Sequence, residues 1–391
     1  MPALRICALV LLLSLSVMAA PAFPEEEQWL QYRTVDAKTS DAIQVRSVSL
    51  EVLLEPPDGL ALPESPGSPL RLAKWNTPLA AGGFVWFALA RSGGESYDRL
   101  YIDYNCDGSL KDEDPIAAAR APGLRSYFGP VKVLFPCDEG PVAYHLNVAC
   151  YAYPKYQQVS VASACWYEGT VTIGGKNAKC TLMDYNSNGS FNDVSADPKD
   201  ADRIALAADG GNSVFSLGKY VQFGGKLYRP EPSPDGAFIV FTPAGDVPLG
   251  AIRLPDGIVS LTLVGDPGMF TFNLPGNTAA LPAGKWRVFA WRAQITDLRG
   301  VKWSLNASDA SSAPPLDVAE GAEVPVDVGP PVITSLSAAK SGAGYTLSEA
   351  FRGRFGERLS ILVADAPPPA PSVRIKNADG SYDRLFQFQY G

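Results

Sequence analysis

Glycine and proline interrupt this chain so often that long helices have little room to form. The 391 residues include 36 glycines and 34 prolines. Proline lacks the N–H group that a helix interior or a central strand needs, and glycine loses more conformational freedom on folding than any other residue. Charged residues make up only 19% of the chain, which is low for a helix-rich cytosolic protein. The pattern predicts a mostly β protein of many short strands joined by turns.

The periodicity of the apolar residues supports the same fold class. Residues 43–54 alternate apolar and polar side chains, as a half-buried strand does, and Phe84 to Ala90 form a nearly continuous apolar run, as a buried strand does. Further strands are predicted at 97–102, 131–135, 142–153, 159–173, 179–183, 214–223, 226–229 and 237–242. A chain of this length is expected to form two or three domains. We therefore predict one large β domain over residues 23–245.

The chain changes in texture after Pro248. The segments LPAGKWRV (281–288) and DVAEGAEVPVDVG (317–329) resemble those of prealbumin-like and carboxypeptidase-regulatory-like β-sandwiches. The resemblance covers about 80 residues and implies a β-sandwich over residues 246–330. Gly329-Pro330-Pro331 then predicts a hinge, and the strand-like runs that follow it imply a small Ig-like β-sandwich over residues 331–391.

The first 22 residues have the pattern of a secretory signal peptide. Arg5 provides the positive charge, Ile6 to Val17 the apolar stretch, and Ala20-Pro21-Ala22 a cleavage site with small residues. No later segment reaches the roughly 18 apolar residues that a membrane helix needs. The sequence therefore predicts export, to the periplasm, the cell surface or the medium, with no membrane span after signal removal.

The charge balance limits the partners. The formal net charge is −8, which argues against nucleic acid, because nucleic-acid binding needs a cationic surface. No cluster of lysine and arginine suggests anionic lipid. A cell-surface polysaccharide or an envelope protein is the partner class that export suggests, and the sequence leaves the oligomeric state open.

The cysteines allow disulfides without defining them. Removal of Cys7 with the signal leaves five, an odd number, so at least one thiol stays unpaired. Cys150 and Cys165 flank a turn-like segment, Tyr153-Pro154-Lys155-Tyr156, and are one candidate pair across a hairpin. The full set after signal removal is Cys106, Cys137, Cys150, Cys165 and Cys180.

Two acidic segments share a pattern that carries specific chemistry. Residues 103–114 (DYNCDGSLKDED, loop one) and residues 184–195 (DYNSNGSFNDVS, loop two) share D-Y-N-x-[DN]-G-S-[LF]-x-D, and each follows a predicted strand. Calcium takes six to eight oxygen ligands, and a short loop with oxygen side chains at positions 1, 3 and 5 and glycine at position 6 can supply most of them. Position 7 contributes its backbone carbonyl, and position 8 places an apolar residue in the core.

Both loops resemble EF-hand and dockerin-type calcium loops. The resemblance implies ligation in loop one by Asp103, Asn105, Asp107, the Ser109 carbonyl and Asp114, since aspartate at position 12 is the dockerin pattern. In loop two it implies Asp184, Asn186, Asn188 and Ser190. The chain as a whole looks like secreted bacterial β proteins that carry such loops. The predicted strands before both loops argue against a helix–loop–helix sensor and favour a structural calcium clip.

Loop two is the weaker candidate. Ser195 stands at position 12, where an acid is expected, and Asp193 or Asp197 are possible substitutes. Loop two has one carboxylate at the matched positions where loop one has three, so it should bind calcium more weakly. A tight turn without metal would use the same residue types, because Asp, Asn and Gly tolerate left-handed backbone and form local hydrogen bonds.

No catalytic motif accompanies the loops. The one histidine, His145, lies in a predicted strand without a G-x-S-x-G segment, and it is expected to be structural. The leading hypothesis is a non-enzymatic exported protein braced by calcium, with no catalytic or cofactor-binding residues assigned. A secreted polysaccharide-acting enzyme, for which Asp98 and Glu168 are examples of possible acids, remains an alternative. A carbohydrate-binding or adhesion protein with exposed tryptophans is a third reading.

Overall fold

The chain is built from β-strands. The computed structural model describes residues 26–35, 45–53, 55–64, 69–137, 140–153, 156–208, 211–273, 276–310, 312–342 and 344–389. These residues contain strands β1 to β31 and no helix, so the prediction of a mostly β protein is confirmed. None of these residues belongs to a helix that could cross a membrane. The predicted signal, residues 1–22, lies outside the described residues.

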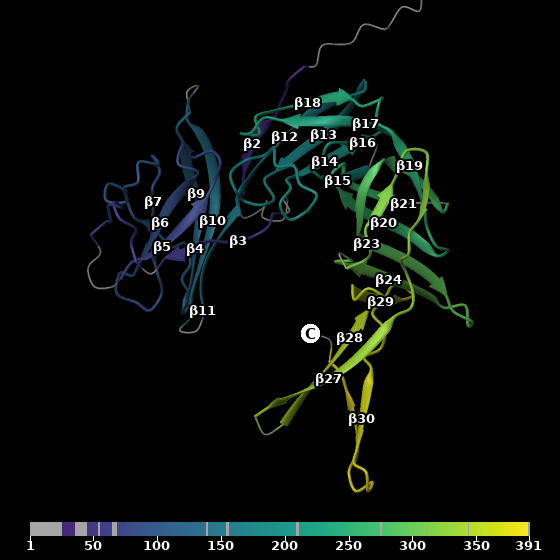
Figure 1. The fold of residues 1–391 in the computed structure, drawn as a ribbon. Helices are drawn as coiled ribbons and strands as arrows, with labels where there is room; N and C mark the ends of the chain where they lie inside the picture. The colour runs from purple at the N-terminus through teal and green to yellow at the C-terminus, as the bar shows by residue number, and fades with distance from the viewer. Residues whose placement is uncertain are drawn as a thin grey trace, which may run out of the picture.

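Two sheets form the lobe on the left of Figure 1. One contains, in spatial order, β4 (Glu51–Leu53), β5 (Arg71–Asn76), β6 (Phe84–Ala90), β7 (Arg99–Ile102) and β8 (Ile116–Ala117). The other contains β3 (Val48–Ser49), β11 (Tyr156–Ser163), β10 (Val142–Tyr153) and β9 (Arg125–Phe135). Strand β10 buries every second side chain from Tyr144 to Ala152 because alternate residues of a strand point to opposite faces.

The sheets together form an arch in Figure 1, and two more of them lie at its top. One contains β15 (Gly211–Ser216), β14 (Arg203–Ala208), β13 (Lys176–Met183), β12 (Cys165–Ile173) and β2 (Gln31–Thr34). The other contains β1 (Gln28–Trp29), β18 (Phe238–Pro243), β17 (Lys226–Pro232) and β16 (Val221–Phe223). One continuous hydrophobic core, from Leu30 to Ile239, joins these sheets to the first two.

The strand predicted over residues 159–173 is two strands in two different sheets. Ala164 separates β11 from β12: its N–H donates to the His145 carbonyl at 2.8 Å, and its own carbonyl accepts from the Val35 N–H at 2.8 Å. The prediction of one strand was wrong because the two runs are both apolar, and periodicity does not reveal a change of sheet.

The third part of the chain has its own core, from Ile252 to Val328. A small sheet contains β22 (Thr278–Pro282), β19 (Leu249–Arg253) and β26 (Glu323–Pro325). A long sheet contains β21 (Gly268–Asn273), β20 (Ile258–Gly265), β23 (Gly284–Thr296), β24 (Lys302–Ser308), β29 (Arg358–Val363), β28 (Gly344–Arg352) and β27 (Ile333–Ser341), with β25 (Leu316–Val318) beside β23. Strands β30 (Ser372–Lys376) and β31 (Asp383–Gln387) form a separate hairpin.

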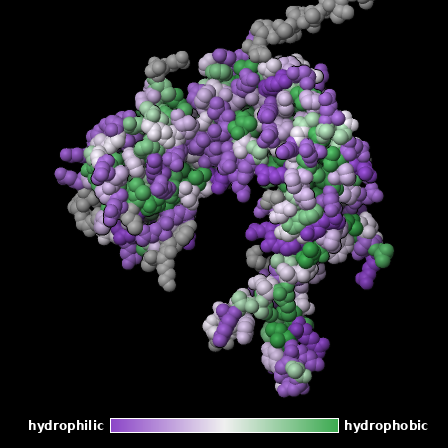
Figure 2. Space-filling model, viewed as in Figure 1, coloured by the Kyte–Doolittle hydropathy of each residue, from purple (hydrophilic) through white to green (hydrophobic). Residues whose placement is uncertain are grey.

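The predicted boundary near residue 330 lies within a shared sheet. Strand β29, from the segment predicted as an Ig-like module, pairs with β24 over six residues. The domain boundaries at residues 245 and 330 remain predictions. The first hydrophobic core ends at Ile239 and the second begins at Ile252, on either side of the boundary predicted at residue 245. The last strands also expose large apolar or aromatic side chains: Ile333, Leu336, Tyr345, Leu385 and Phe386. Hydrophobic residues also gather in the lower part of the molecule in Figure 2.

The five described cysteines are free thiols. The candidate pair of Cys150 and Cys165 is wrong, because Cys150 lies opposite Val159 within the β10–β11 hairpin. Cys165 follows the break at Ala164 and lies opposite Thr34 of strand β2. The change of sheet places the two thiols on different strand pairs.

Candidate metal centre

Both acidic loops begin where a strand ends. Loop one follows β7, and loop two follows β13. The N–H of Asp103 donates to the Trp86 carbonyl at 3.0 Å, which attaches the first residue of loop one to the neighbouring strand β6. The predicted strands before the loops are confirmed, and no helix flanks either loop in the described chain.

The side chains of loop one curl around its backbone. The Asp103 carboxylate accepts hydrogen bonds from the N–H groups of Asp107 and Gly108, both at 3.1 Å. The Asn105 Oδ1 accepts from the same Asp107 N–H at 3.1 Å, and Asp107 Oδ1 accepts from the Ser109 N–H at 2.7 Å. The oxygens predicted at positions 1 and 3 therefore converge on one backbone nitrogen.

Loop two has the same internal geometry. The Asp184 carboxylate accepts from the N–H groups of Asn188 and Gly189 at 3.3 and 2.7 Å. The Asn186 Oδ1 accepts from Asn188 at 3.1 Å, and Asn188 Oδ1 accepts from Ser190 at 2.8 Å. Position 4 has positive φ in both loops, +57° at Cys106 and +58° at Ser187, and position 6 is glycine with positive φ.

The apolar residue at position 8 holds each loop against the body of the protein. Leu110 and Phe191 are 0% and 1% exposed, so the prediction that position 8 enters the core is confirmed. The Leu110 N–H donates to the Ala61 carbonyl at 2.8 Å, and the Phe191 N–H donates to the Pro234 carbonyl at 2.9 Å. Each loop is thus anchored to a segment distant in sequence.

An acid that was not predicted returns to each loop. Glu113 Oε1 accepts from the Tyr104 N–H at 2.9 Å, and Asp202 Oδ1 accepts from the Tyr185 N–H at 3.1 Å. These two acids therefore occupy equivalent places at position 2 of the two loops. Asp114, the predicted twelfth ligand, is exposed. Glu113 could have been found from the sequence, because it is an acid at position 11, next to the expected ligand position 12. Asp202 could not, because it lies outside the 12-residue loop.

Negative charge accumulates in loop one. Burial raises the pKa of Asp103 and of Glu113, and neighbouring carboxylates add to both shifts. No ion pair within the described residues involves an acid of loop one. A cation at this loop would therefore relieve the repulsion between charges that hydrogen bonds only partly compensate.

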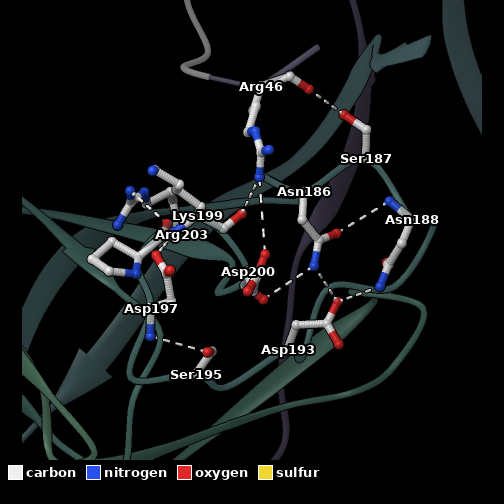
Figure 3. A network of polar contacts seen from close by, with 11 residues as sticks. Arg46, Asn186, Ser187, Asn188, Asp193, Ser195, Asp197, Lys199, Asp200 and Arg203 are labelled. Carbon is white, nitrogen blue, oxygen red and sulfur yellow. Dashed lines mark hydrogen bonds and ion pairs between the residues drawn. The ribbon is translucent and has the colours of Figure 1, made fainter. Parts of the chain in front are cut away.

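Loop two is closed by hydrogen-bond donors. The side-chain amides of Asn186 and Asn188 donate to Asp193 at 3.0 and 2.7 Å, as Figure 3 shows. The Tyr144 hydroxyl donates to Asp184 at 2.6 Å. Burial raises the pKa of Asp184 to about 7 and the pKa of Asp202 well above its usual range. Asn188 thus stands where loop one has the Asp107 carboxylate, whereas Asn186 matches Asn105, whose own amide donates to Asp107 at 2.9 Å.

Ser187 ties loop two to three other parts of the chain. Its hydroxyl accepts from the Ser163 N–H at 2.9 Å and donates to the Arg46 carbonyl at 2.8 Å. Its carbonyl accepts from Trp75 Nε1 at 2.8 Å. The Arg46 guanidinium reaches the Lys199 carbonyl and lies 3.9 Å from Asp200 (Figure 3). These contacts give loop two a structural role whether or not it binds metal.

The donor set of loop one fits a hard divalent cation. It combines the carboxylates of Asp103 and Asp107, the Asn105 amide oxygen and a backbone carbonyl, which are ligand types that calcium takes. No group of three or more His, Cys, Asp or Glu side chains that could hold a metal ion occurs in the described part of the chain. A calcium loop also uses amide and backbone carbonyl oxygens as ligands, and these are not among the four side-chain types named.

The other predicted candidates are surrounded by ordinary structural contacts. His145 Nδ1 lies 2.7 Å from the Tyr32 hydroxyl, and burial lowers its pKa. Asp98 accepts from Ser92, and Glu168 forms an ion pair with Arg33. Four tryptophans are buried, which leaves no exposed platform built from them: Trp75, Trp166, Trp286 and Trp291.

Comparison with known proteins adds no identity to this geometry. No protein-family model matches the chain, and neither a curated protein nor a solved structure shows significant similarity to it.

Proposed function

We propose that this is a non-enzymatic protein of the cell envelope or the secreted fraction, in which calcium at loop one braces a β scaffold that serves in surface structure or binding. The observation that carries the proposal is the geometry of loop one. Oxygen atoms of Asp103 and Asn105 converge on one backbone N–H, and a third oxygen side chain follows at Asp107. Export, on which the location rests, is supported by the pattern of the first 22 residues.

Loop two has a different part in this proposal. Its two asparagine amides and the Tyr144 hydroxyl donate to the carboxylates of Asp193 and Asp184. These donors compensate the negative charge that calcium would otherwise compensate. We therefore propose loop one as the main calcium site and loop two as a weaker copy whose own hydrogen bonds maintain its shape.

The test is thermal unfolding of the mature protein with and without calcium. Saturation at tenfold to hundredfold excess over Kd stabilises a folded protein by about 1.4 to 2.7 kcal/mol. We expect millimolar calcium to raise the unfolding temperature, and Asp103→Ala to abolish most of that rise. Asp246→Ala serves as the control, because Asp246 is exposed and paired with Arg229 far from either loop in sequence.

The outcomes separate clearly. The same calcium effect in Asp103→Ala and in the unchanged protein would remove loop one as the site. No calcium effect on the unfolding temperature of the unchanged protein would overturn the proposal as a whole. A chelator titration that reverses the stabilisation distinguishes bound calcium from a general salt effect.

A further inference from the structure

A cavity of about 320 Å³ opens on the sheet formed by β3, β11, β10 and β9. Its residues include Ser47, Arg120, Tyr127, Gly129, Asn147 and Ser160. Tyr127, Ala149 and Ser160 are neighbours in register across β9, β10 and β11. They alternate with core residues, so the cavity lies on the face turned away from the core. This sheet is on the side of the lobe that faces the rest of the arch (Figure 1).

A β-bulge shapes the floor of the cavity. The register between β10 and β9 shifts between Leu146 and Val148, so that two residues of β9, Gly129 and Pro130, lie opposite the single residue Asn147 of β10. Gly129 lies opposite with a φ of +128°, and a Cβ atom there would be 2.7 Å from Asn147 Oδ1. The side-chain amide of Asn147 lines the cavity and forms no hydrogen bond with the described residues. The glycine therefore leaves room for an amide that has both donors and an acceptor available.

An arginine lies at one wall. The Arg120 guanidinium lies over the Tyr127 ring, 4.5 Å from its centroid, and the two residues exchange backbone hydrogen bonds. Stacking on the ring fixes the orientation of the guanidinium group, and its N–H groups remain able to donate hydrogen bonds to a ligand. No carboxylate within the described residues forms an ion pair with Arg120 or with the nearby Arg125. In a chain of net charge −8, these two arginines give this face of the sheet a local positive charge.

Tyrosines extend the site along the sheet. Tyr127 and Tyr151 are in edge-to-face contact at 6.3 Å, and Arg125 Nε donates to the Tyr153 hydroxyl at 2.7 Å. A hydrogen bond from Tyr151, with the nearby guanidinium groups of Arg125 and Arg120, lowers the pKa of Tyr127. Tyrosine rings and arginine guanidinium groups thus lie beside the Asn147 amide and the Ser160 hydroxyl of the cavity.

We propose that this cavity, the β-bulge site, binds a saccharide that carries a carboxylate, such as a uronic acid unit of a polysaccharide. Arg120 would hold the carboxylate, since a guanidinium matches its two oxygens. Asn147 and Ser160 would hydrogen-bond the ring hydroxyls, and the volume is at the lower end of small-molecule sites, about 300–1,000 Å³. This inference extends the proposed role in surface binding and is independent of calcium in loop one.

The experiment is calorimetric titration of the mature protein with trigalacturonate, and with galactotriose as the uncharged counterpart. We expect trigalacturonate to bind more tightly, and its affinity to fall as salt is raised. Arg120→Ala should weaken binding about tenfold or more, because it removes a charged hydrogen-bond partner. Asn147→Asp should also weaken it, since it adds a like charge and replaces the amide donors.

Arg384→Ala is the matched control, because Arg384 is exposed on the distant hairpin strand β31. Its affinity for trigalacturonate should equal that of the unchanged protein. The proposal is overturned if trigalacturonate does not bind or if galactotriose binds equally well. It is also overturned if Arg120→Ala and Asn147→Asp both unfold at the same temperature as the unchanged protein and neither weakens binding. Binding that persists in chelator and in Asp103→Ala shows that the β-bulge site is independent of loop one. A failure of either proposal is then recognised separately.

Discussion

Glu113 turns back into loop one and accepts a hydrogen bond from the Tyr104 N–H, whereas its neighbour Asp114 is exposed. The structure thus distinguishes two adjacent acids that the loop pattern alone does not. We expect Glu113→Gln to lower the calcium affinity about tenfold, because it removes a negative charge directed into the loop. Asp114→Asn should change the affinity by less than about twofold, as expected for an exposed charge. Calorimetric calcium titration measures both, and a larger effect of Asp114→Asn would return Asp114 to the ligand set.

His145 provides a second test at the residue scale, because it is the one histidine in the chain. Burial lowers its pKa, with a smaller contribution from Lys132. A group whose folded pKa is lowered stabilises the protein above the unfolded value, about 6.5, and that stability is lost as pH falls through the folded pKa. We expect one imidazole signal in the NMR spectrum of untagged protein, titrating below pH 6.5. A midpoint above about 6.5, the value of an unburied imidazole, would contradict the burial of this ring.

The two loops, taken as elements, share a backbone but differ in what surrounds their glycines. Gly108 has a φ of +80° with open space where a Cβ would lie. Gly189 has a φ of +96°, and a Cβ there would lie 2.8 Å from Thr77 Oγ1. Gly108→Ala should therefore cost about 1 kcal/mol, from backbone strain alone. Gly189→Ala should cost about 2 to 4 kcal/mol, because overpacking is added to the strain.

Chemical denaturation in the presence of chelator measures both glycine variants without a contribution from calcium. The two alanine substitutions change the same position of the same local pattern, so each serves as the control for the other. Equal losses would mean that the packing of Gly189 against Thr77 adds no constraint beyond the backbone strain.

At the scale of the whole molecule, the chain near Gly218 and Tyr220 contacts residues 267–268 of the second core region, and we call this contact the seam. The Tyr220 N–H donates to the Pro267 carbonyl at 2.9 Å, and Gly218 faces Gly268 so closely that a Cβ on Gly218 would be 2.3 Å from the Gly268 Cα. Gly218→Ala should therefore separate the seam at a cost of about 1 to 3 kcal/mol. We expect calorimetric unfolding to broaden or divide into two transitions, one for each core.

Gly245→Ala is the matched control for this seam. Gly245 lies between the two cores in sequence, and a Cβ there meets no atom within 4 Å. Its unfolding profile should match that of the unchanged protein. A single sharp transition in Gly218→Ala with an unchanged midpoint would show that the seam does not couple the two cores.

Much of the local structure was predictable because it depends on neighbours within a few residues. The strand at β10 follows from alternation between Tyr144 and Ala152, and the turn shape of both loops follows from oxygen side chains placed before a glycine. The burial of Leu110 and Phe191 was predictable for the same reason. In each case the residues that determine the outcome lie within a single segment.

Other features were not predictable because they depend on contacts between distant segments. Asp202 reaches loop two only after strand β14 is in place beside β13, and the change of sheet at Ala164 depends on partners at His145 and Val35. The space that Gly129 leaves for Asn147 exists only once β9 and β10 are paired with a bulge. Neither the periodicity of apolar residues nor the spacing within a motif predicts these contacts between distant segments.

The sequence by itself thus determined the β class, the places of both acidic loops and the apolar residue that anchors each of them. The tertiary structure decided which acids return to the loops and where the cavity beside Arg120 and Tyr127 opens on the sheet. The physical reason is the range of the interactions involved. Backbone preference and side-chain alternation act between near neighbours, whereas charge compensation and cavity shape are determined by residues that only folding brings together.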